Sequence, residues 1–137
     1  MKIVFLDFDG VLTTPATRFR FGDPSCVMAL NRITTITDAK IVVSSTWRIE
    51  GLKAVKDSLK DWGVVGEVIG ITPRLRDENA TRGAEIKQWL IENPGVSRFV
   101  ILDDDTDMGE LREHLVKCNA EVGLTDTLVG FAIQKLL

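Results

Sequence analysis

The chain has 137 residues, 45% of them hydrophobic and 27% charged, with a formal net charge of −3. This length favours one domain over residues 1–137 with a sizeable core. The small negative charge argues against a protein that coats DNA through a basic surface. The two cysteines, Cys26 and Cys118, form no C-x-x-C pair, and the sequence has one histidine, His114, so a zinc site is not expected. We expect both cysteines to be free thiols in a cytoplasmic protein. No apolar run approaches the roughly 20 residues that span a bilayer, so we expect no membrane segment.

The first predicted element is a buried strand at residues 2–6, which ends at two aspartates followed by Gly10. Side chains alternate along a strand, so Asp7 and Asp9 point the same way if the strand geometry persists. Two carboxylates held together repel each other. A divalent cation, or protonation of one of them, removes that cost.

A loop and a helix follow. Residues 13–24 contain Thr, Pro and Gly, which favour irregular structure, and Arg18 and Arg20 alternate with two phenylalanines as in a short hairpin or flap. The helix is predicted to begin at Asp23 or Ser25 as N-cap and to run to about residue 38. Its predicted core-facing positions are Val27, Leu30, Ile33 and Ile36.

Further strands and helices alternate along the chain. Strands are predicted at 40–43, 67–71, 98–102 and 116–118, and an irregular charged loop at 72–79. Helices are predicted at about 52–62, 82–93 and 108–115, and after Thr125 as cap, with Leu128, Phe131, Ile133 and Leu136 as apolar positions of the last one. The alternation predicts an α/β fold, with a three-layer, doubly wound (Rossmann-like), mostly parallel sheet.

Polar clusters follow three of these strands. They are the Asp7/Asp9 pair, the hydroxyls of residues 44–46, and four acids within residues 103–107. In sheets of this class, ligands bind at the carboxyl ends of the strands, so we expect the clusters to converge there. Asp7, Asp9 and Asp103 form an oxygen-rich ligand set that suits Mg²⁺. A hydroxyl such as that of Ser44, together with an arginine, suits a phosphate.

The segment Asp7-Phe8-Asp9-Gly10-Val11-Leu12 resembles the first motif, D-x-D-G-[VT]-L, of the haloacid dehalogenase (HAD) superfamily of aspartate-nucleophile phosphotransferases. The resemblance implies that Asp7 is the nucleophile and forms an aspartyl-phosphate. It also implies that Asp9 is the general acid and base, with its backbone carbonyl on Mg²⁺.

The other three motifs of the superfamily follow in order. Ser44 resembles the second, with Ser45 as an alternative register, and Arg82 resembles the third, where the family usually has Lys; Lys87 is the competitor. Asp103 resembles the fourth and is implied to bind the metal, with Asp104 and Asp107 as acids at or around it. Arg48 follows the hydroxyl turn, and its side chain either contacts phosphate or packs across Trp47.

Only about 30 residues separate the first motif from the second, and about as many separate the second from the third, which leaves no room for a cap domain. Capless relatives tend to act on large or extended substrates, and the hydroxyl turn and acidic motif are also similar to a capless branch found in RNA-repair proteins. We therefore expect an Mg²⁺-dependent phosphomonoesterase, with a nucleic-acid end or a nucleotide as partner, in a monomer or weak dimer. The alternatives are a nucleotidase acting on free nucleotides and a phosphate-binding module without turnover.

Overall fold

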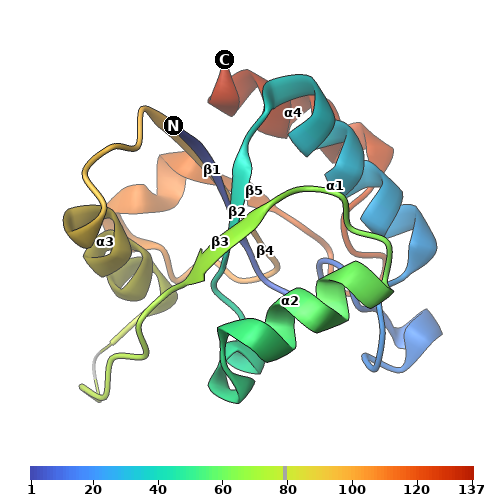
Figure 1. Cartoon of the computed structure of the whole chain (residues 1–137), viewed down its shortest axis with the longest axis horizontal. Helices are drawn as coiled ribbons and strands as arrows, with labels where there is room; N and C mark the ends of the chain where they lie inside the picture. Colours follow the sequence, from blue (N-terminus) through green and yellow to red (C-terminus); the bar gives the residue numbers. More distant parts are fainter. Residues whose placement is uncertain (79) are drawn as a thin grey trace.

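A five-stranded parallel sheet forms the centre of the protein (Figure 1). The computed structural model describes residues 1–78 and 80–137. The strand order is β3-β2-β1-β4-β5, and every neighbouring pair is parallel. The strands are β1 (Lys2–Leu6), β2 (Lys40–Val43), β3 (Val68–Ile71), β4 (Arg98–Asp103) and β5 (Leu115–Lys117).

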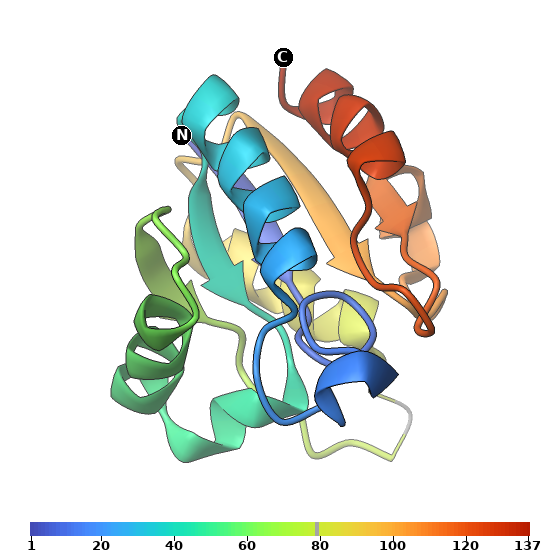
Figure 2. The same ribbon diagram turned by 90° about the vertical axis from the view of Figure 1, so that its right-hand side faces the viewer.

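Helices cover both faces of this sheet, which confirms the predicted three-layer α/β fold. Figure 2 shows α1 (Pro24–Thr37) and α4 (Asp126–Leu136) in front of the sheet and α3 (Arg82–Glu92) behind it. The helix α2 (Leu52–Asp61) belongs to the α1 and α4 layer, since Val55 and Leu59 pack into the same core. Short 3-10 helices η1 (Pro15–Thr17), η2 (Thr46–Glu50) and η3 (Gly109–His114) complete the chain.

Strand alternation divides the core into two layers. Val4 and Leu6 of β1 pack with α1, α2 and α4, whereas Ile3 and Phe5 pack with Ile86 and other residues on the α3 side. The carboxyl ends of the strands all point to one edge, where η2 and the loop around η1 lie (Figure 2). Among the described residues, no helix combines the length and the apolarity needed to cross a membrane.

Two predicted core positions are wrong. Ile36 is 60% exposed and Phe131 is 57% exposed. The reason is geometric, since an α-helix turns by about 100° per residue and a strict spacing of three drifts by about 60° per step. Ile36, nine residues after Val27, therefore faces the opposite side of α1. In α4 the buried positions are Val129, Ala132 and Leu136.

Two local predictions also need correction. The segment before β5 is the 3-10 helix η3 rather than an α-helix, and Leu115 already belongs to the strand. The flap contains η1 followed by left-handed backbone at Arg18 and Phe19, both with φ 54°, and not a hairpin. Thr125 is the N-cap residue of α4, as predicted, although its side chain makes no capping hydrogen bond. The loop after β3 is irregular over residues 72–78, as expected, and residue 79 lies outside the described residues.

Candidate active site

One row of polar side chains crosses the sheet at its carboxyl edge. The backbone amides of Asp7, Ser44 and Thr72 each donate a hydrogen bond to a carbonyl of the neighbouring strand, over 3.1, 2.9 and 3.0 Å respectively. These bonds continue the parallel register one residue past β1, β2 and β3. The register therefore aligns four residues from four strands, namely Thr72, Ser44, Asp7 and Asp103.

This row faces α3. Leu6 lies in the core layer of α1 and α4, so the alternation of β1 turns the next side chain, Asp7, to the other face. All four residues of the row are buried, with exposures between 0% and 7%. Sequence reasoning predicted three of them and missed Thr72, whose only signal was its place directly after a predicted strand.

Three carboxylates of this edge form a cluster that could hold a cation. Asp7, Asp103 and Asp104 each offer one oxygen, and the three oxygens lie within 4.8 Å of one another. Oδ2 of Asp103 is buried without a hydrogen-bond partner. An all-oxygen set with an unpartnered buried carboxylate atom fits a hard divalent cation such as Mg²⁺.

Gly10 allows Asp104 to join this cluster. The glycine has φ +83°, and a Cβ built on it would lie 2.6 Å from Oδ2 of Asp104. Only glycine combines that backbone conformation with such a close approach. The glycine of the first motif thus makes room for a carboxylate of the fourth.

The cluster changes the protonation of its own members. Burial and the charge of Asp103 raise the pKa of Asp7 to about 8, against the opposing effects of Arg82 and of the hydrogen bond from the Phe8 amide. Burial also raises the pKa of Asp103 to about 6, with Asp104 adding to the shift. Without a cation, Asp7 therefore retains its proton over most of the neutral range.

Arg82 brings a positive charge to the row. Its Nε lies 3.8 Å from Oδ2 of Asp103, and its Nη1 is buried without a partner. The start of α3 is fixed by Thr81, whose hydroxyl accepts from Ala84 N, and by Asp107, whose carboxylate accepts from Arg82 N. Lys87 forms an ion pair with Glu110, with its side chain 54% exposed. Of the two candidates for the basic motif, the structure therefore brings only Arg82 to the row.

Asp9 lies beside the cluster rather than in it. Its Oδ1 accepts hydrogen bonds from Oγ1 of Thr13 at 2.7 Å and from Nε1 of Trp47 at 3.1 Å. Trp47 is itself held edge-on between the rings of Phe8 and Trp62. The indole thus orients the second aspartate of the first motif, and the carboxylate cluster contains Asp104 where we expected the Asp9 side chain.

The two serines after β2 differ in their bonding. Oγ of Ser44 is buried and has no hydrogen-bond partner, whereas Oγ of Ser45 accepts from Trp47 N at 3.2 Å and caps η2. A buried hydroxyl without a partner is costly unless a ligand completes it. The bonding therefore favours Ser44 over Ser45 as the residue that faces a phosphate.

Arg48 spans the space between η2 and α3. Its Nη1 donates to the carbonyls of Ser44 and Ser45, at 3.1 and 2.9 Å, and its Nη2 donates to Oε2 of Glu85 at 2.7 Å. The same Glu85 oxygen accepts from Leu75 N at 3.0 Å. Both charged side chains are at least 90% buried. The two terminal nitrogens of the guanidinium are thus engaged by protein groups, whereas Nε is buried without a partner. These bonds fix the hydroxyl turn relative to α3 and to the loop after β3.

The remaining candidates lie outside the row. His114 stacks on Phe99, with ring centroids 4.0 Å apart. Cys26 and Cys118 are buried free thiols, and burial raises the pKa of Cys118 to about 12. Neither thiol is ionised at neutral pH.

The Arg48–Glu85 pair should be a large contributor to stability. Replacing Glu85 by Gln leaves a buried guanidinium without a counter-charge, so we expect Glu85→Gln to lower the free energy of unfolding by about 3 kcal/mol in urea titrations. Asp57→Asn is the matched control, because it removes an exposed ion pair with Lys53 and should change stability far less. Equal effects of the two substitutions would contradict this assignment.

Cation binding should depend on pH in a defined direction. The pKa of Asp7 is raised from 3.8 to about 8, so the folded protein without metal loses stability as pH rises between these values. Mg²⁺ must displace that proton, and its apparent Kd should fall by up to about tenfold per pH unit between about pH 6 and 8. We expect the Mg²⁺-induced rise in Tm to be larger at about pH 8 than at about pH 6.

Two variants check this cation site. Asp103→Asn should abolish the Mg²⁺-induced rise in Tm, whereas Asp61→Asn, which changes an exposed acid at the end of α2, should retain it. A rise in Tm that is independent of pH, or that survives in Asp103→Asn, would show that Mg²⁺ binds elsewhere.

Comparison with known proteins agrees with this geometry. Residues 3–129 match the family model of the HAD domain in Swiss Army Knife RNA repair proteins. No curated protein and no solved structure gives a match. The matched segment contains the whole row and the carboxylate cluster. The chain therefore belongs to the family of HAD domains found in Swiss Army Knife RNA repair proteins.

Proposed function

We propose that the protein is an Mg²⁺-dependent phosphomonoesterase that acts on phosphorylated nucleic-acid ends through an aspartyl-phosphate on Asp7. One observation carries this proposal. Two kinds of buried polar groups without hydrogen-bond partners meet at the row: the carboxylate oxygen Oδ2 of Asp103, and two donors, Oγ of Ser44 in the row and Nη1 of Arg82, which approaches the row from α3. The carboxylate suits a cation and the donors suit an anion, as a site for a metal and a phosphoryl group requires. Family membership supports a phosphatase-type hydrolase at the superfamily level.

Asp7, Asp103 and Asp104 would hold the cation, together with the backbone carbonyl of Asp9 that the family resemblance implies. When bound, Mg²⁺ would supply positive charge that favours the ionised form of Asp7 and neutralises charge on the phosphoryl oxygens. Arg82 adds a second positive charge on the α3 side of the row. Ser44 offers its hydroxyl to a phosphoryl oxygen.

The reaction then has two steps. A carboxylate oxygen of Asp7 attacks phosphorus and forms a P–O bond, while the P–O bond to the leaving alcohol breaks and Asp9 gives its proton to the departing oxygen. Water next attacks phosphorus and gives a proton to Asp9, which breaks the bond to Asp7 and releases phosphate. Trp47 and Thr13 hold the Asp9 carboxylate in one orientation for both transfers.

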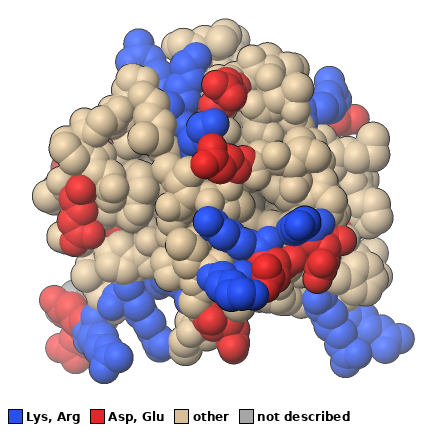
Figure 3. Space-filling view, viewed as in Figure 1, with Lys and Arg blue, Asp and Glu red and all other residues tan. Residues whose placement is uncertain are grey.

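The open edge supports an extended substrate. Among the described residues, the flap around η1, η2 and the loops after β3 and β4 lie at the carboxyl ends of the strands, and no further domain is inserted between the strands (Figure 2). Figure 3 shows the side of the molecule on which β3 and α2 lie in front (Figure 1), with basic and acidic side chains mixed over it and basic groups projecting at its two lower corners, rather than one continuous basic surface. Such a surface suits a local contact with a chain end better than the coating of a long duplex. The family description, which refers to RNA repair, favours a nucleic-acid end.

Two other functions remain as alternatives to be tested. A nucleotidase would use the same row on free nucleotides. It is distinguished by a higher kcat/KM for mononucleotides than for oligonucleotides with a terminal phosphate. A phosphate-binding module would bind vanadate tightly without turnover on a broad phosphoester panel. The buried pair Asp7 and Asp103 weighs against the module, because a phosphate cradle alone gains nothing from adjacent carboxylates.

The nucleophile can be tested directly. Asp7→Asn should reduce hydrolysis of p-nitrophenyl phosphate to background, and EDTA should do the same to the wild-type protein. Because the substitution removes a buried, repelled carboxylate, we also expect Asp7→Asn to raise the Tm of the metal-free protein at about pH 8. Full activity of Asp7→Asn would rule out the assignment.

A second measurement keeps this test independent of folding. Beryllofluoride should form a stable adduct on Asp7 of the wild-type protein in the presence of Mg²⁺. The adduct should be absent in Asp7→Asn and retained in the exposed control Asp61→Asn. An adduct that forms on Asp7→Asn would place the covalent chemistry on another residue.

A further inference from the structure

A groove of about 350 Å³ begins at Thr72 and is not used by the reaction described above. It lies between η2, the end of β3 and α3, and its lining includes Thr72, Ile49, Pro73, Arg74 and Trp89. A smaller hollow of about 110 Å³ beside it shares Ile49 and Arg74. Thr72 thus belongs both to the polar row and to the groove, so the groove adjoins the proposed phosphate site.

Thr72 itself needs a partner. The residue is 2% exposed, and its hydroxyl is buried without a hydrogen bond, as is the hydroxyl of its neighbour in the row, Ser44. Adjacent strands lie about 4.8 Å apart, so Thr72 stands about 5 Å from Ser44 and about 10 Å from Asp7 along the row. A buried hydroxyl at this distance suits the sugar that carries a phosphate bound between Asp7 and Ser44.

The walls of the groove suit a nucleoside. Ile49 is 66% exposed and, with Pro73 and Trp89, provides an apolar surface against which a base or sugar can pack. Arg74 is exposed at the same groove. Its charge also adds to the lowering of the pKa of Arg48, which is mainly due to burial, so two cationic groups stand close together.

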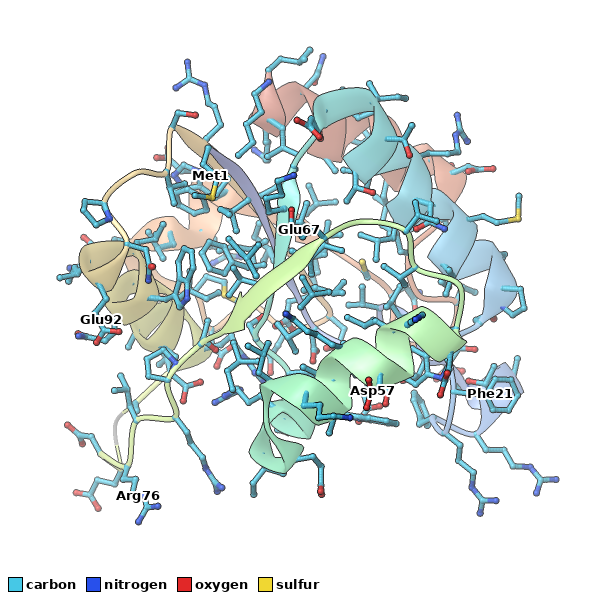
Figure 4. The ribbon with its side chains drawn as sticks, viewed as in Figure 1. Met1, Phe21, Asp57, Glu67, Arg76 and Glu92 are labelled. Atoms are coloured by element: carbon cyan, nitrogen blue, oxygen red, sulfur yellow. The ribbon has the colours of Figure 1, made fainter. Side chains whose placement is uncertain are left out.

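The groove is too short for a long polyanion, and it carries a negative charge at its far end, where Glu92 lines it. It reaches Glu92 at the last turn of α3, whereas Arg82 at the first turn contacts the row. An 11-residue helix spans about 16 Å, enough for one nucleoside. The carboxylate of Glu92, labelled in Figure 4, would repel a further phosphate at that end. The rest of the chain would therefore leave along Arg74.

We propose that this groove binds the terminal nucleoside of a phosphorylated nucleic-acid end, with Thr72 on its sugar and Arg74 on the next phosphate of the chain. The proposal rests on the proposed function and specifies where its leaving group lies. It also explains how a site without a cap can favour an oligonucleotide over a small ester, since the contacts come from the groove and not from a lid.

The test compares three variants on three substrates. The variants are Thr72→Val, Arg74→Ala and the control Arg76→Ala, which alters an exposed arginine of the same loop that does not line the groove and points away from the molecule (Figure 4). The substrates are p-nitrophenyl phosphate, a nucleoside monophosphate, and an oligoribonucleotide with a terminal phosphate, at the 3′ or the 5′ end.

Arg74→Ala should lower kcat/KM for the oligonucleotide about tenfold, through a higher KM. The kcat/KM values for the two substrates without a second phosphate should stay nearly the same. Thr72→Val should lower kcat/KM about tenfold for both nucleotide substrates and less for the aryl ester. Arg76→Ala should match the wild type on all three. Equal losses in Arg74→Ala and Arg76→Ala, or equal losses of Thr72→Val on all substrates, would overturn the proposal.

Failure of the proposed function gives a different pattern. If the wild-type protein hydrolyses none of the three substrates, the phosphatase assignment is wrong. The proposed role of the groove is then tested by binding alone. Fluorescence anisotropy with the same phosphorylated oligonucleotide should then show a Kd about tenfold weaker for Arg74→Ala than for Arg76→Ala. Equal Kd values of the two variants would overturn the groove as well.

Discussion

The burial of two adjacent carboxylates is the constraint on which the rest of the site depends. β1 and β4 pair Leu6 with Leu102, so the next residues, Asp7 and Asp103, fall side by side on the α3 face. Few groups stabilise the charges of these two carboxylates. Phe8 N donates to Asp7 at 2.8 Å, Asp105 N donates to Asp103 at 3.0 Å, and Arg82 approaches Asp103 from α3. Oδ2 of Asp103 stays without a hydrogen bond. The fold thus holds a local electrostatic cost that a cation would relieve, which is typical of functional sites.

The helix α3 connects this row to the hydroxyl turn. Arg82 and Glu85 are three residues apart and lie on one side of its first turn. Arg82 reaches the row, whereas Glu85 holds Arg48, which in turn holds the carbonyls of Ser44 and Ser45. One helical turn therefore sets the distance between the basic group and the serine. A displacement of α3 would move both at once, so the buried ion pair also fixes the geometry of the proposed phosphate site.

The sequence predicts the strands and the edge of the site because those signals are local. Apolar runs, their turn residues and the acids after β1 and β4 are each read within a few positions. Thr72 could not be predicted in the same way, since its place in the row depends on the pairing of β3 with β2, which shifts register between Ile41 and Val42. The partner of Arg48 lies 37 residues away. Such pairings arise from packing between elements and leave no pattern in a single sequence.

In the proposed mechanism, the protonation of Asp7 links cation binding to activation of the nucleophile. A nucleophilic carboxylate must be ionised, yet burial and Asp103 raise the pKa of Asp7 to about 8. Without a cation the group is mostly protonated at neutral pH and cannot attack phosphorus. A cation at Asp103 and Asp104 would favour loss of that proton, so in the proposed mechanism the metal-free protein would be inactive. In a site with no cap to exclude water or other esters, this coupling would confine hydrolysis to the protein with its cation bound.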